Sequence, residues 1–186
     1  VYALEFLLAA RAQGLDVPQL LSHALHSQGL YLVPDIVVNH MGNFFTYRDR
    51  WAPGDPAQGW EAHDQTPPVP RPSQPPFDQN DPRSPKQRQA AAYHWTPDIS
   101  DYNDPLQEQT FQMGGLDDLN TENPVVRRTL RRSFGHWIKT VGVDGFRVDT
   151  AFYVPPAFFA DFLRAPDAAA PGVLRVARGT GRQAFH

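Results

Sequence analysis

The sequence contains no cysteine among its 186 residues, so it has no disulfide framework and no thiolate metal site. Without cysteine, the sequence does not indicate whether the protein belongs to an oxidising or a reducing compartment. Charge is also low: 17 basic and 20 acidic residues give a formal net charge of −3. No basic block is present to neutralise phosphates, so we expect no nucleic-acid partner. The longest apolar run, 6–10, is too short to cross a bilayer, and we expect no membrane partner.

Glycine-rich phosphate loops are also absent after the predicted strands, which excludes the usual nucleotide-binding folds. What is present is an alternation of helix and strand signals. Residues 17–27 predict a helix with Pro18 in its first turn, and Gly29 follows as a stop signal. The apolar run 30–40, interrupted only by Pro34, predicts a strand. This order is typical of half a parallel-sheet unit.

The same order returns later in the chain. Asn123 and Pro124 predict the start of a helix, and Gly142 predicts its end before a strand at 143–149. The helix carries a predicted core-facing stripe at helical spacing, made of Val126, Leu130, Phe134 and Trp137.

Three further elements are predicted near the end of the chain. Residues 155–165 predict a helix, the tail 171–186 a second helical piece, and 184–186 the start of another strand. The whole order fits either a (β/α) barrel or a doubly wound sheet.

Residues 41–122 have a different composition. Ten prolines between positions 53 and 85 argue against a regular helix or a central strand. Disorder is one interpretation. Aromatic residues nevertheless occur throughout the region, whereas linkers are usually poor in them. We therefore expect an ordered, irregular excursion, and long loops of this kind are commonly functional.

Both predicted strands become polar at their carboxyl ends, one at Asn39 and His40, the other at Arg147 and Asp149. In barrels and open α/β sheets this edge carries the site. Strand alternation places Arg147 and Asp149 on one side, where Arg147 can pair with Asp149 and keep it ionised. A held carboxylate suits a nucleophile or an electrostatic stabiliser. The alternative is a purely structural ion pair.

Three stretches, in this order, resemble motifs of the alpha-amylase family of glycoside hydrolases (family thirteen): DIVVNH at 35–40, LDDLN at 116–120 and GFRVD at 145–149. The resemblance covers about residues 20–186. It implies an α/β fold, here a fragment of a TIM (β/α)8 barrel with a long irregular insertion.

The resemblance also implies three parts of the chain. Residues 1–40 form part of the barrel, with a helix and strand three, although 1–19 match poorly. Residues 41–122 are a domain inserted after strand three. Residues 123–186 supply helix three, strand four, helix four and the start of strand five.

Site residues follow from the same resemblance. Asp149 matches the nucleophile, Arg147 the arginine that orients it, and His40 a histidine that hydrogen-bonds the sugar. Asn39 and Asp118 match positions that bind calcium in many members, the alternative being a structural role alone for Asn39. No cofactor is required, and calcium is the one ion that the resemblance brings into consideration.

The implied reaction is retaining hydrolysis or transfer at an α-glucosidic bond of an oligo- or polysaccharide. Asp149 forms a covalent glycosyl-enzyme, and a second carboxyl group about 5 Å away acts as acid and then as base. Three tryptophans of the insertion either stack on sugars or simply pack it: Trp51, Trp60 and Trp95.

Two features depart from the family pattern. Many starch-cleaving members carry a Lys-His pair after the nucleophile, where this chain has Phe152 and Tyr153, which favours shorter oligosaccharides or transfer. The family's general acid, a Glu ending strand five, has no counterpart, because Asp161 falls within a helix and Asp167 in a loop.

We therefore expect a fragment of a longer enzyme or a truncated gene product that is inactive and poorly folded alone. Two alternatives remain open. One is a non-catalytic carbohydrate-binding remnant of such an enzyme. The other is a self-contained small α/β domain with a structural Arg-Asp pair.

Overall fold

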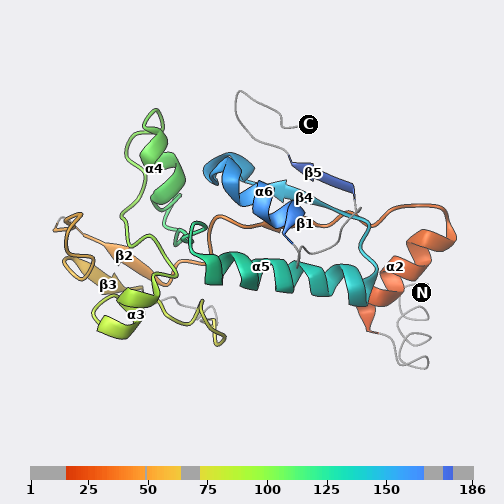
Figure 1. The fold of residues 1–186 in the computed structure, drawn as a ribbon, viewed down its shortest axis with the longest axis horizontal. Helices are drawn as coiled ribbons and strands as arrows, with labels where there is room; N and C mark the ends of the chain where they lie inside the picture. Colours follow the sequence, from red (N-terminus) through yellow and green to blue (C-terminus); the bar gives the residue numbers. More distant parts are fainter. Residues whose placement is uncertain (1–15, 49, 64–71, 166–173, 178–186) are drawn as a thin grey trace.

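A three-stranded parallel sheet lies at the centre of the computed structural model, which describes residues 16–48, 50–63, 72–165 and 174–177 (Figure 1). Its strand order is β1 (Asp35–Val37), β4 (Gly145–Asp149) and β5 (Leu174–Ala177). Asp35 lies opposite Arg147 and Val37 opposite Asp149. Strands β1 and β4 are therefore adjacent, although more than a hundred residues separate them in sequence.

Strand β1 is shorter than the predicted strand at 30–40. Pro34 has no backbone N–H to give to a sheet, and the residues before it are exposed or half-buried. After Val38 the chain leaves β4 and pairs through its backbone with residues 117–119, as the hydrogen bond from the Leu119 N–H to the Asn39 carbonyl shows at 2.8 Å. The apolar segment 30–40 therefore lies in three environments: the exposed or half-buried residues before β1, the strand β1, and the residues that pair with 117–119.

Helix α2 (Val17–Ser27) confirms the predicted bounds. Asp16 and Gln19 form a capping box, which satisfies backbone donors at the first turn. The helix packs on the segment that leads into β4 through side chains: Ser22 Oγ donates to the Gly142 carbonyl at 3.1 Å, and His26 contacts Asp144 at 2.8 Å. These contacts join the two helix–strand units.

Helix α5 (Pro124–His136) begins as predicted, with the Asn123 side chain accepting from the Val125 N–H at 2.9 Å. It continues as a π-helical turn, η1 (Trp137–Val141), and ends at Gly142 with φ 76°. The prediction for Trp137 is wrong: this residue is 42% exposed. It stands where the wider π turn starts, so the α-helical spacing that placed it in the stripe ends there.

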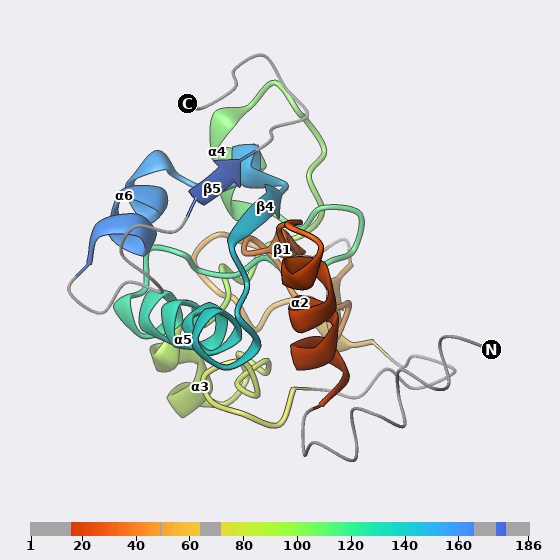
Figure 2. The ribbon, with the colours of Figure 1, turned by 90° about the vertical axis from the view of Figure 1, so that its right-hand side faces the viewer.

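Helix α6 (Pro156–Arg164) lies within the predicted range and follows a short 3₁₀ turn, η2 (Ala151–Tyr153). Figure 2 shows α5 between α6 and α2 beside the sheet. The helical piece predicted in the tail is wrong where the structure describes it. Residues 174–177 form β5, because they pair in parallel with the open edge of β4 and so satisfy backbone groups of both strands. The strand start predicted at 184–186 lies outside the described residues.

In the described residues between β1 and α5 there are four short elements: β2 (Phe45–Tyr47), β3 (Trp60–Ala62), α3 (Pro85–Ala90) and α4 (Pro105–Thr110). Strands β2 and β3 are antiparallel, and Figure 1 places this group at the opposite end of the molecule from α2. Phe45 is 1% exposed and lies 5.4–5.6 Å from the rings of Tyr93 and Trp95. These rings belong to the same buried cluster as Phe146 of β4.

None of the helices in the described part of the chain is long and apolar enough to cross a membrane.

Replacing Phe158 by Ala tests the packing of α6. Phe158 is 0% exposed and stacks on Phe162 at 5.5 Å, so the substitution leaves a cavity and lowers the free energy of unfolding by about 3–5 kcal/mol. Urea unfolding followed by circular dichroism at 222 nm measures the change. The matched control is Leu106→Ala on α4, which is 66% exposed and should change stability by less than about 0.5 kcal/mol. Equal midpoints for the two variants would contradict this packing.

Candidate active site

The carboxyl ends of β1 and β4 lie at one edge of the sheet because the two strands are parallel and in register. On β4 the side chains alternate as predicted: Phe146 and Val148 are 1% and 4% exposed, while Arg147 and Asp149 are only partly buried. Phe146 packs against Phe134 of α5, with ring centroids 5.6 Å apart. The charged pair therefore lies on the sheet face away from α5.

Arg147 bridges two carboxylates. Its Nη2 lies 3.3 Å from Asp149 Oδ1, and its Nη1 donates to Asp35 Oδ2. The side chains of Arg147 and Asp149 are 35% and 39% exposed, so the pair is partly solvated rather than fully buried. Asp35 is a partner that the sequence analysis missed. Strand alternation could have shown only its side of the strand, because Asp35 and Val37 lie opposite the buried Ile36 and Val38, whereas the register of β1 on β4 sets its partner.

The residue after Asp149 has a special backbone conformation. Thr150 has φ 54°, in the left-handed region that β-branched residues rarely adopt. Its hydroxyl donates to Asn39 Oδ1 and lies 2.7 Å from the Asp149 carbonyl oxygen. Asn39 is 2% exposed, so this contact satisfies a buried acceptor and ties the end of β4 to the chain after β1. Thr150 was also missed, and no signal in the sequence marks it.

His40 lies close enough to Asp149 for the charge of that carboxylate to influence it. Burial lowers the pKa of the His40 imidazole, and the negative charge of Asp149 only partly opposes this shift. The Nδ1 atom is buried and has no hydrogen-bond partner among the described residues. A neutral imidazole at this edge can exchange a hydrogen bond with a ligand hydroxyl. The structure thus brings together His40, Arg147 and Asp149.

Asp118 lies beside this group through its backbone rather than its side chain. Residues His40 and Asp118 form an antiparallel bridge, and the Met41 N–H donates to the Asp117 carbonyl at 2.9 Å. The Asp118 side chain is 3% exposed and its Oδ2 lies 2.5 Å from His94 Nδ1. His94 is a further residue that the sequence analysis missed.

The two residues that the family pattern suggested for calcium, Asn39 and Asp118, each have a protein partner in this structure. The side-chain Oδ1 of Asn39 accepts a hydrogen bond from the Thr150 hydroxyl, and Oδ2 of Asp118 lies against His94 Nδ1. Among the residues described, no three His, Cys, Asp or Glu side chains are arranged to hold a metal ion. Calcium takes about six to eight oxygen ligands, which include side-chain amides and backbone carbonyls, so Asn39 and Asp118 remain a prediction as calcium positions.

The tryptophans proposed for sugar stacking differ in exposure. Trp60 and Trp95 are each 7% exposed and pack around Phe45, so both serve the core. Trp51 is half-buried, and its Nε1 donates to the Trp95 carbonyl at 2.9 Å.

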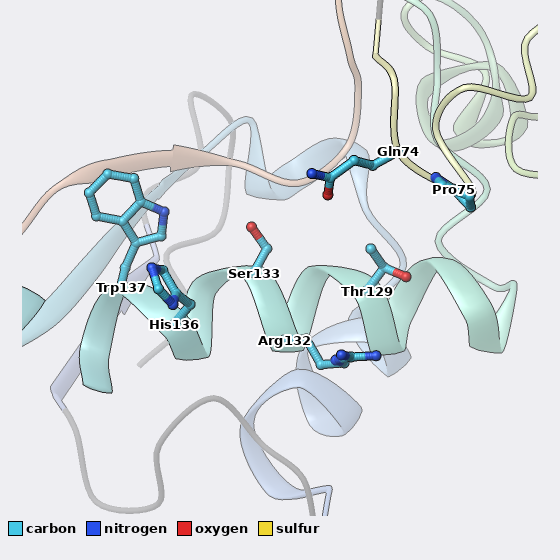
Figure 3. Close-up of a pocket in the computed structure, with 7 residues that line it drawn as sticks. All are labelled: Gln74, Pro75, Thr129, Arg132, Ser133, His136 and Trp137. Atoms are coloured by element: carbon cyan, nitrogen blue, oxygen red, sulfur yellow. The ribbon is translucent and has the colours of Figure 1, made fainter. Parts of the chain in front are cut away.

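A groove of about 500 Å³ lies along α5 (Figure 3). Its lining contains the exposed Trp137 and, facing the helix from the segment before α3, Gln74 and Pro75. None of its lining residues belongs to the strand ends that carry Asp149 and His40.

The comparison with a family model decides the family, since the model for the alpha amylase catalytic domain matches residues 15–173. The chain belongs to the alpha-amylase family. Among curated relatives, the beta/alpha-amylase of Paenibacillus polymyxa is 29% identical over 152 residues, which are 80% of this chain and 10% of that protein. The alpha-amylase of Streptomyces lividans is 32% identical over 84 residues, 42% of this chain and 8% of that protein.

Solved alpha-amylases share the fold. The enzyme of Geobacillus thermoleovorans, determined with acarbose, has a TM-score of 0.59 at 22% identity and covers 86% of this chain and 28% of its own. The enzyme of Malbranchea cinnamomea has a TM-score of 0.57 at 22% identity, and the match covers 88% of this chain and 28% of that enzyme. The chain therefore spans a small part of its relatives. Its helices and strands follow part of the alpha-amylase fold, whose catalytic domain is a TIM barrel.

The Thr150–Asn39 hydrogen bond of this alpha-amylase-family chain can be tested by two substitutions. Thr150→Val removes the hydroxyl but keeps the branched shape, leaving the buried Asn39 oxygen unsatisfied, and should lower the free energy of unfolding by about 1–3 kcal/mol. Thr150→Ser keeps the hydroxyl and should cost less than half as much. Urea midpoints measure both. Equal losses would mean that the hydrogen bond is not what the position requires.

Proposed function

We propose that this chain is part of a retaining glycoside hydrolase of the alpha-amylase family, acting on α-glucosidic bonds of oligo- or polysaccharides. Asp149 is its nucleophile. The observation that carries this proposal is the group at the carboxyl end of β4, where Arg147 holds Asp149 and His40 lies near it. A partly solvated carboxylate that a cationic partner holds in place can attack a sugar carbon.

The roles follow from the geometry. A carboxylate oxygen of Asp149 attacks the anomeric carbon, and the bond from that carbon to the leaving oxygen breaks. Arg147, itself held by Asp35, keeps Asp149 oriented. His40 hydrogen-bonds a sugar hydroxyl. A second carboxyl group gives the leaving oxygen its proton and later takes a proton from the water that releases the sugar.

We further propose which parts of the barrel the chain supplies. Strands β1 and β4 are barrel strands three and four, and α5 and α6 are the helices before and after strand four. Residues 41–122 are the domain inserted after strand three, which walls one side of the sugar cleft. Tight packing of Phe45 with Tyr93 and Trp95 supports a wall of fixed shape.

The proposed substrate class is argued from the relatives and from one difference between this chain and the family pattern. The named relatives are amylases, and one was solved with acarbose. After Asp149 this chain has Phe152 and Tyr153, which stand edge to face at 6.2 Å in the turn η2. We propose that these rings favour shorter oligosaccharides, or transfer between them, over internal cleavage of starch.

Trapping of a glycosyl-enzyme tests the nucleophile. A 5-fluoro-α-glucosyl fluoride carries a leaving group that needs no proton, so Asp149 can react even where a general acid is missing. Fluoride leaves, and we expect mass spectrometry of peptides to find one 5-fluoroglucosyl adduct on Asp149. The Asp149→Asn variant should carry none, while Asp101→Asn in an exposed loop should be labelled as the unchanged chain is. A label on another residue, or none, refutes Asp149 as nucleophile.

The same 186-residue chain should not hydrolyse a natural α-glucoside. Asp35 shares Arg147 with Asp149, and Asp161 is bound by Arg131 of α5, so neither is placed to protonate a leaving group. Maltooligosaccharides incubated with the pure chain and separated by chromatography should remain intact. Robust hydrolysis that is lost in Asp149→Asn would contradict this prediction. Binding of the sugars without any labelling of Asp149 would favour the non-catalytic remnant.

A further inference from the structure

The groove along α5 lies on the helix side of the sheet. Most of its lining comes from one side of α5 and η1, where residues recur three or four positions apart: Thr129, Arg132, Ser133, His136 and Trp137. Another side of the same helix carries the buried Val126 and Leu130, and Phe134 packs on Phe146 of β4. Asp149 lies on the other face of the sheet, so the groove is separate from the candidate active site.

The polar groups of the groove are largely without protein partners. Within the part of the chain that the structure describes, four lining side chains have no hydrogen bond or ion pair to another residue: Gln74, Arg132, Ser133 and Trp137. The Thr129 hydroxyl donates to the Val125 carbonyl at 2.9 Å and can still accept, and His136 Nδ1 lies 3.2 Å from Thr140 Oγ1. An amide, a guanidinium, hydroxyls and an indole N–H therefore remain available to a ligand in one place.

The indole of Trp137 supplies the one large apolar surface of this groove. Figure 3 shows it at one end beside His136, while Gln74 faces Ser133 farther along α5. Trp137 is 42% exposed, because the π turn η1 begins at this residue and ends the core-facing stripe. A single exposed aromatic is ordinary on a protein surface. This one, however, borders a groove of polar groups, where an indole offers an apolar face and a hydrogen-bond donor to the same ligand.

The composition of the lining indicates the class of ligand. A volume of about 500 Å³ falls within the range of about 300–1,000 Å³ that is usual for small-molecule sites. An apolar ligand would leave the polar groups dehydrated and unpaired. An anion would meet only one permanent cation in the lining, Arg132. A neutral ligand with many hydroxyls can pair with the amide, hydroxyl and guanidinium groups while its C–H groups cover the indole.

We propose that the groove along α5 is a second, non-catalytic binding site for a neutral oligosaccharide. The choice of an α-glucan as that oligosaccharide rests on the proposed function, whereas the site itself does not depend on Asp149 being a nucleophile. A long glucan held in this groove stays close to the chain while another stretch of it reaches the strand ends.

Nuclear magnetic resonance of the 186-residue chain, isotopically labelled at its tryptophan indoles, tests the site with maltotriose. The indole N–H signal of Trp137, identified by its absence from Trp137→Phe, should shift to saturation as the sugar is added. The signals of Trp60 and Trp95, each 7% exposed, should stay in place. A Trp137 signal that does not move, or a chain that does not bind maltotriose, would overturn the proposal. A shift with inorganic phosphate and none with maltotriose would overturn it as well.

Substitutions in the lining give the second measurement, the dissociation constant for maltotriose by calorimetry. Trp137→Ala removes the apolar face and the N–H donor, and should raise the constant about tenfold. Gln74→Ala leaves η1 untouched and should raise it about threefold, so it decides the case in which Trp137→Ala disturbs the helix. The matched control is Tyr31→Ala, an aromatic that is 76% exposed and does not line the groove, which should bind as the unchanged chain does. Unchanged constants for Trp137→Ala and Gln74→Ala would refute the site.

A third measurement separates the groove from the candidate active site. Maltotriose should shift the Trp137 signal equally in the Asp149→Asn variant and in a chain already labelled by 5-fluoro-α-glucosyl fluoride. Loss of the shift in Asp149→Asn would mean that the sugar does not occupy the groove, and would overturn the proposal. A persistent shift in a chain that the fluoride does not label at Asp149 would support the groove while refuting the proposed nucleophile.

Discussion

The parallel pairing of β1 with β4 sets the positions of the charged groups at the candidate site. Its register puts Asp35 opposite Arg147, so the guanidinium of Arg147 reaches Asp35 across the strands and Asp149 along its own strand. The same register brings Asn39, just past β1, to the hydroxyl of Thr150. A slip of one residue would reverse the faces of the side chains and separate all of these partners.

Arg147 and His94 each lie between two carboxyl groups. Arg147 joins Asp35 to Asp149 at the strand ends, and His94 joins Asp118 to Glu122. Arg147 is partly solvated and leaves Asp149 accessible, whereas His94 is largely buried and fixes its neighbours. The difference in exposure separates a group that a ligand can reach from a group enclosed by protein.

Local signals in the sequence predicted much of the framework. The proline and glycine positions gave the bounds of α2 and the limits of the α5–η1 helix, and alternation gave the buried and open sides of β4. Trp137 was misplaced because a π turn begins there, which residue spacing does not reveal. Residues 174–177 were misread as helical because Leu and Ala suit helices, whereas pairing with β4 makes them a strand.

The sequence by itself determined the order of helices and strands, the family and the polar residues at the strand ends, because these depend on neighbouring residues and on motifs. Only the tertiary structure decided the partners of those polar residues. Asp35 meets Arg147 across 112 positions, and Thr150 meets Asn39 across 111. His94 meets Asp118 across 24. Such contacts arise from strand register and from the path of a long segment, and no local pattern encodes either one.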